Sequence, residues 1–218
     1  MNILGISAGF HDAGISSVVN GDIVFAAHSE RYSRHKHDSK LNSEMLFDCL
    51  TRSGTPDVIA YYERPWIKKT RQLYAGQWNA LWTDWSVRNM INKIDHEGVL
   101  KKVPIKTYNH HLSHAAAGFQ TSPYKDSTVI VIDAIGEWDT ISIWDARYDE
   151  KGQAKYKKLW GQKYPHSIGL MYSAFTKEVG LRPLDEEYIL MGMAAYGNSH
   201  YKDAFKTVLL DEPTSLTF

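Results

Sequence analysis

The chain has 218 residues, of which 43% are apolar and 23% are charged, as in ordinary globular proteins rather than disordered ones. Because 25 basic side chains balance 25 acidic ones, we expect the protein to bind neither nucleic acid nor a membrane surface. The sequence contains no transmembrane run and no signal-peptide pattern, and its single cysteine, Cys49, excludes an internal disulfide, so we expect a cytoplasmic protein.

The beginning of the chain predicts a meander of three strands. Strand-like segments at 3–7, 15–19 and 22–27 are separated by a turn of small residues and by the dipeptide Asn20-Gly21. Asn-Gly is a strong hairpin signal because both residues tolerate a positive φ. We therefore expect these strands to pair in sequence order.

The next segments predict a loop, a helix and a fourth strand. The basic, histidine-containing segment 31–40 has the composition of a solvated surface loop. Asn42 is placed to cap a helix over 43–52, which Gly54 ends. Residues 57–62 are strand-like.

Three tryptophans, Trp78, Trp82 and Trp85, recur at i, i+4 and i+7. This spacing predicts one stripe of a long helix. Such a stripe belongs more often to a core or a partner surface than to a binding platform, so we interpret it as structural.

The remaining chain predicts alternating strands and helices and then a second meander. A strand at 103–108 leads into an alanine-rich helix. The order of the elements indicates α/β layers in two linked halves. Further strands are expected at 127–133 (buried, from its apolar run), 140–148 and 155–162, and further helices at 167–179 and 188–196.

His110 and His114 stand four residues apart at the start of the alanine-rich helix, so their imidazoles lie on one face and can share a metal ion. With 10 histidines in the chain this spacing arises readily by chance, but a helix that follows a strand is where α/β folds place ligands. Asp133, at the end of the next strand, is the natural third ligand. Two imidazoles and one carboxylate favour iron(II), with zinc as the alternative.

Two other features of this helix narrow the functions and ligands that it can provide. The glutamate of a zinc-protease helix is missing, which argues against a protease. His111 points about 100° away from its neighbour around the helix, so we interpret it as a packing or supporting residue.

A turn of small residues with Gly9, His11 and Asp12 joins the first two strands. Backbone N–H groups at such a turn can approach a phosphate closely, although a tight strand connection is the simpler alternative. A carboxylate near His11 would raise its basicity, but adjacent residues of an extended chain point apart.

A second turn, Gly136-Glu137, follows Asp133 and repeats this arrangement of strand, small residue, acid and strand. Two phosphate-facing hairpins opposite one another are the basis of ATP binding in the actin-like fold.

Six motifs are spread along the chain: GISAGFHDA at 5–13, ERYSRHKHD at 30–38, HHLSHAA at 110–116, DAIGEW at 133–138, YSAFT at 172–176 and MGMAAYG at 191–197. Together and in this order, they resemble the N-terminal part of the O-carbamoyltransferases of the nodulation and tobramycin-antibiotic type. The resemblance covers nearly the whole chain.

The resemblance implies an α/β fold of the actin-like (ASKHA, ribonuclease H-like) kind, with a mixed sheet and helices. This fold is related to the tRNA threonylcarbamoyl-transfer proteins and is joined in the family to a YrdC-like domain. It implies a first subdomain at 1–125 and an incomplete second one at 126–218. Because the later acidic ligand, the adenosine-binding segment and the YrdC-like domain are missing, we expect this chain to be incomplete as an enzyme.

The implied reaction converts carbamoyl phosphate and ATP into carbamoyl-adenylate, whose carbamoyl group passes to a small-molecule hydroxyl acceptor at the metal site. By resemblance, His110, His114 and Asp133 are the metal ligands. His11, with Asp12 beside it, takes the proton from the acceptor hydroxyl.

The resemblance also implies a nucleotide site. Lys36 reaches a phosphate or carbamoyl oxygen, and Gly9, Gly136 and Glu137 face the nucleotide.

Two other functions stay open. The chain could be a non-catalytic binding or assembly half-domain that pairs with a second chain or forms a homodimer, since the surface left by the missing half would be apolar. A kinase or ATPase relative of the same fold would share both turns but would need no two-histidine metal site.

Overall fold

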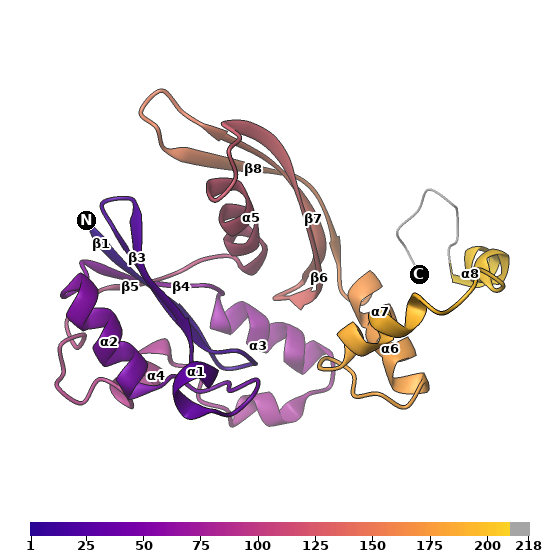
Figure 1. Cartoon of the computed structure of the whole chain (residues 1–218), viewed down its shortest axis with the longest axis horizontal. Helices are drawn as coiled ribbons and strands as arrows, with labels where there is room; N and C mark the ends of the chain where they lie inside the picture. Colours follow the sequence, from indigo (N-terminus) through magenta and orange to yellow (C-terminus); the bar gives the residue numbers. More distant parts are fainter. Residues whose placement is uncertain (210–218) are drawn as a thin grey trace. The chain divides into compact units, whose positions relative to one another are not determined.

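The computed structural model describes residues 1–209 (Figure 1). The chain forms two compact units, Met1–Ser113 and His114–Phe218, and the boundary lies inside helix α5 (His110–Gln120), which is continuous. The subdomain division expected after residue 125 stays a prediction. Among the described residues, no helix has both the length and the apolar character needed to cross a membrane.

The first unit is built on a five-stranded mixed sheet of order β3-β2-β1-β4-β5. Strands β1, β2 and β3 are antiparallel neighbours, whereas β4 runs parallel to β1 and β5 runs parallel to β4. The Asn20-Gly21 turn joins β2 to β3 with φ angles of 54° and 102°, so the predicted meander is confirmed. The strands are β1 (Asn2–Ser7), β2 (Gly14–Val19), β3 (Asp22–His28), β4 (Val58–Tyr61) and β5 (Ile105–Thr107).

Helix α2 contributes to the core of this unit. The Asn42 side chain accepts from the N–H groups of Glu44 and Met45 at 2.8 and 3.2 Å, and Gly54 ends the helix with a φ of 73°. This capping is the one predicted. The helices are α1 (Glu30–Ser33), α2 (Ser43–Ser53), α3 (Pro65–Tyr74), the 3₁₀ helix η1 (Trp78–Leu81) and α4 (Val87–Asn92). Buried core side chains from both layers include Leu4, Ile6, Ile15, Met45, Leu46, Cys49, Ile59 and Ile91.

The long helix predicted from the tryptophan spacing is wrong. Trp78 begins the four-residue η1, and Trp82 lies just after it with 89% of its surface exposed. Asp84 Oδ1 accepts the Ser86 N–H at 2.9 Å, which closes a side-chain turn between η1 and α4, so the two are not one helix. Only Trp85 is partly buried among the three.

The second unit contains a three-stranded antiparallel sheet of order β6-β7-β8. Its helix α6 is capped by Ser167, whose Oγ accepts the Leu170 N–H at 3.0 Å and donates to the Ala134 carbonyl at 2.6 Å, so α6 is fixed to β6. The elements are β6 (Asp126–Gly136), β7 (Asp139–Tyr148), β8 (Ala154–Lys163), α6 (Ile168–Glu178), α7 (Glu187–Ala194) and α8 (Lys202–Leu209).

Strand β6 forms as predicted but is not buried on both faces. Val131 is buried, whereas Ile130 and Ile132 are each 61% exposed. The burial predicted from the apolar run was therefore too high. Alternate residues of a strand point to opposite faces, and only the face that carries Val131 is buried. The mixed five-stranded sheet with its helices confirms the predicted α/β fold class.

Candidate functional site

Helix α5 begins where the parallel strands β4 and β5 end. The Tyr108 N–H donates to the Tyr61 carbonyl at 3.0 Å, which continues the pairing of these strands toward the helix. The side-chain oxygen of Asn109 accepts a backbone N–H of the first turn at 2.9 Å and so caps the helix. Ser113 Oγ donates to the Tyr62 carbonyl at 2.7 Å. The first turn of α5 is thereby fixed against the end of β4.

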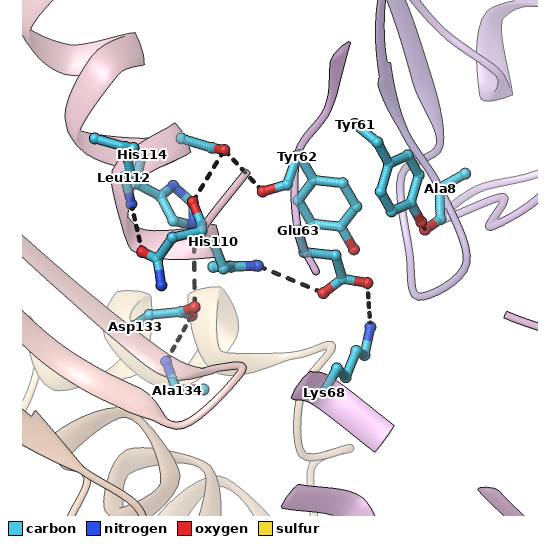
Figure 2. Close-up of polar contacts among 12 residues, drawn as sticks. Ala8, Tyr61, Tyr62, Glu63, Lys68, His110, Leu112, His114, Asp133 and Ala134 are labelled. Carbon is cyan, nitrogen blue, oxygen red and sulfur yellow. Dashed lines mark hydrogen bonds and ion pairs between the residues drawn. The ribbon is translucent and has the colours of Figure 1, made fainter. Parts of the chain in front are cut away.

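The candidate metal site consists of His110 and His114 on α5 and Asp133 on β6 (Figure 2). Because α5 is one continuous helix, its two histidines lie one turn apart on the same face. His114 Nε2 lies 3.9 Å from Asp133 Oδ2. One ligand atom from each of the three residues lies within 4.8 Å of the others. The structure therefore brings together the three residues singled out in the sequence.

The environment of these side chains fits a divalent cation. The His110 side chain is 13% exposed and that of His114 is 54% exposed, so the group is anchored on one side and reachable on the other. Asp133 Oδ1 accepts the Ala134 N–H at 2.7 Å, which orients the carboxylate. Two imidazoles and one carboxylate are a donor set that suits iron(II) or zinc and leaves coordination positions for other ligands.

A buried carboxylate that the sequence analysis missed lies behind His110. Glu63 follows β4 and is 1% exposed, and its Oε1 accepts from Lys68 Nζ at 2.9 Å. Its Oε2 lies 3.6 Å from His110 Nδ1. Burial raises the pKa of the Glu63 carboxyl, but His110 and Lys68 outweigh this effect and hold the pKa below its ordinary value. The signal in the sequence was an acid directly after a predicted strand.

The first turn places His11 in contact with an acid, contrary to the expectation that adjacent side chains point apart. His11 Nδ1 lies 2.9 Å from Asp12 Oδ2, and His37 Nδ1 lies 3.3 Å from Asp12 Oδ1. The physical reason is that Asp12 has a φ of 48°, so the chain is not extended at this point. One carboxylate thus bridges two partly exposed imidazoles.

The residues assigned to the nucleotide by resemblance lie in both units. Gly9 has a φ of 91°, a conformation that favours glycine, and its N–H donates to the Ser39 carbonyl at 3.0 Å. Lys36 is exposed on the turn after α1. Gly136 ends β6, and Glu137, which is buried, turns the chain toward β7 with a φ of 57°. Their nucleotide-binding role stays a prediction.

His111 is fully buried, which agrees with the interpretation of this residue as a packing residue. Sequence spacing alone could make that distinction, because His111 lies about 100° around the helix from His110.

Comparison with known proteins identifies the family. Residues 86–213 match the model of the carbamoyltransferase N-terminus. An uncharacterized protein of Synechocystis, sll1178, is 34% identical over an alignment that covers 100% of this chain and 38% of that protein. The nodulation protein NolNO of Sinorhizobium fredii is 26% identical, with 90% of this chain and 29% of that protein covered. The chain therefore spans about a third of the length of these curated relatives.

The chain also aligns with a solved structure. The PPX-GPPA enzyme of Aquifex aeolicus aligns with 86% of this chain and 59% of its own at 11% identity and a TM-score of 0.28. The family model matches more than half of the chain, and the matched range includes α5 and β6. The resemblance found in the sequence is thereby confirmed, and the chain belongs to the carbamoyltransferase N-terminus family.

Proposed function

We propose that this chain is the N-terminal portion of an ATP-dependent O-carbamoyltransferase that carries the metal-binding and acceptor-activating residues. The observation that supports the proposal most directly is the approach of His110, His114 and Asp133 to within 4.8 Å of one another. Membership in the carbamoyltransferase family supplies the reaction class.

In the proposed site, one nitrogen of each histidine and one oxygen of Asp133 hold iron(II) or zinc. Such an ion supplies Lewis acidity toward oxygen atoms of the reacting phosphate or carbamoyl group. The Ala134 N–H fixes the Asp133 carboxylate, and the cap at Asn109 fixes the helix that carries both imidazoles. The chain thus holds its ligands on regular elements rather than on loops.

The proposed acceptor is a small-molecule alcohol. A hydroxyl is a poor nucleophile at neutral pH, and a positioned base contributes roughly 10²–10⁴-fold to the rate. Asp12 Oδ2 lies 2.9 Å from His11 Nδ1. A proton held on Nδ1 leaves the Nε2 lone pair for the acceptor.

In the proposed transfer, one bond to the carbamoyl carbon forms and another breaks. The acceptor oxygen forms a bond to the carbamoyl carbon, the bond from that carbon to the adenylate oxygen breaks, AMP leaves, and the hydroxyl proton moves to His11 Nε2. In the proposed reaction, water releases inorganic phosphate from carbamoyl phosphate, and the resulting carbamate attacks ATP to give carbamoyl-adenylate and pyrophosphate. By resemblance alone, we assign Gly9, Gly136 and Glu137 to nucleotide binding and Lys36 to a phosphate or carbamoyl oxygen.

A non-catalytic assembly role is the second candidate, because Ile130 and Ile132 of β6 expose apolar surface in the described part of the chain. Light scattering on the purified protein tests it. A second copy bound at this strand would be lost when both isoleucines are replaced by threonine, while a monomer at all concentrations would contradict this role.

The metal site is tested by loading the purified protein anaerobically with iron(II), and separately with zinc, and measuring bound metal per chain. We expect about one ion per chain in the wild type and a loss of binding in the H110A/H114A variant. The matched control is H96A/H200A, which removes two exposed imidazoles outside the site. Equal metal content in both double variants would reject the site.

A further inference from the structure

The second oxygen of Glu63 faces the candidate metal site. Glu63 and Lys68 are only 1% and 7% exposed, so their charges are almost completely removed from water. Lys68 Nζ donates to Oε1 at 2.9 Å, while Oε2 lies 3.6 Å from His110 Nδ1 (Figure 2). A simple ion pair would need only the first of these contacts. The direction of the second contact suggests a role toward His110.

Several elements hold Glu63 in this position. The Tyr62 N–H donates to the Ile6 carbonyl at 3.3 Å, and the Tyr62 carbonyl accepts from Ser113 Oγ at 2.7 Å. The residue before Glu63 is thus bound to β1 on one side and to the first turn of α5 on the other. Glu63 leaves the sheet beside His110 for this reason.

Lys68 is fixed from the opposite direction. Pro65 starts α3 at a position where its missing N–H is not needed, and Lys68 lies one turn further on. Its ammonium lies 4.9 Å from the centre of the Trp85 ring and 5.4 Å from that of Phe10, distances at which an aromatic face attracts a cation. The ammonium therefore orients the Glu63 carboxylate and leaves Oε2 directed at His110.

We propose that Glu63 is a positioning residue that accepts the Nδ1 proton of His110 and thereby presents the Nε2 lone pair of His110 to the cation. The proposal rests on the metal site proposed above. A metal-binding histidine commonly donates its other ring N–H to a carboxylate, which fixes both tautomer and ring orientation. The 3.6 Å separation is longer than a direct hydrogen bond, and we expect it to shorten when the cation is bound.

The test compares two double variants that both remove the buried ammonium. E63M/K68M replaces the ion pair with apolar side chains of similar volume, a change that is often neutral or stabilising. E63Q/K68M also removes both charges but keeps a carbonyl oxygen that can accept the His110 proton. Zinc affinity is measured by competition with a chromophoric chelator, and thermal unfolding checks the fold of each variant.

We expect E63M/K68M to bind zinc roughly 10–100-fold more weakly than the wild type. E63Q/K68M should recover most of that loss, because its acceptor is retained. A purely structural role for the ion pair predicts no difference between these two variants. Equal zinc affinity in E63M/K68M and the wild type would overturn the positioning role.

A second measurement observes the tautomer of His110 directly in the folded, metal-free protein. Nitrogen-15 NMR of the metal-free wild type should show His110 as the Nδ1–H tautomer, and E63M/K68M should shift it toward Nε2–H. An Nε2–H tautomer in the wild type would overturn the proposal. If the wild type binds no zinc, the metal site fails while the tautomer still tests the contact. If H110A/H114A loses zinc but E63M/K68M does not, the positioning role alone fails.

Discussion

Replacing Glu63 alone with methionine should destabilise the fold strongly. The change leaves Lys68, which is 7% exposed in the wild type, without the carboxylate oxygen that lies 2.9 Å from its Nζ. Removing one partner of a buried pair costs about 3–5 kcal/mol, because the other charge stays buried. The rings of Trp85 and Phe10 near the ammonium retain part of the stabilisation. We therefore expect E63M to lower the free energy of unfolding by about 3 kcal/mol.

Urea denaturation followed by circular dichroism measures this effect. The wild type, E63M and E63M/K68M are compared under identical conditions without added metal. The double variant removes both charges, so its free energy of unfolding should lie within about 1 kcal/mol of the wild-type value. If E63M itself unfolds within that same range, the Glu63–Lys68 pair is not a buried charge pair and the reasoning is refuted.

Three further predictions concern acid stability, a helix cap and the proposed base. Folding lowers the pKa of Glu63, so its contribution to the free energy of unfolding is complete above the unfolded pKa of about 4.3 and is lost as the pH falls through the folded pKa. Lowering the pH should therefore destabilise the wild type more than E63M/K68M. Parallel plots of unfolding free energy against pH for the two proteins would contradict this. The N42A variant should lose about 1 kcal/mol in urea denaturation, because the cap bonds at 2.8 and 3.2 Å disappear; an unchanged midpoint would argue against the cap. If the proposed carbamoyl transfer is correct, H11A should lower kcat by roughly 10²–10⁴-fold and leave the metal content unchanged. Loss of metal in H11A would instead assign His11 to the metal site.

Local signals in the sequence were sufficient to predict most helices and strands. Asn20-Gly21 encodes its own turn through two residues that tolerate a positive φ, and both adopt one. Asn42 and Gly54 mark the two ends of α2 for equally local reasons. These predictions succeed because the residues that determine each feature are neighbours in the chain.

The tryptophan segment shows where periodicity fails. The spacing of Trp78, Trp82 and Trp85 is helical, but Asp84 lies among them and closes a side-chain turn with the Ser86 N–H. Asp residues favour such turns over the helix interior. The periodic spacing took account only of the large apolar side chains. The polar residue between them, Asp84, decided the conformation of the backbone.

Strand β6 shows a different limit. Its apolar run predicted the strand, but the exposure of Ile130 and Ile132 depends on what covers the sheet. A run of apolar residues contains no alternation from which one buried face can be identified. The strand could therefore be predicted, and the burial of its two faces could not.

The candidate metal site was visible in the sequence, whereas Glu63 was not, because the two arise from different kinds of information. A four-residue spacing is enough to place His110 and His114 on one helical face. Glu63 reaches His110 only because β4 and β5 are parallel and in register, with Tyr61 opposite Thr107. Residues that follow the paired ends of two parallel strands leave the sheet at the same edge. Pairing the two predicted strands would therefore have placed Glu63 beside His110, so strand register, rather than any motif, is the information that the sequence analysis lacked.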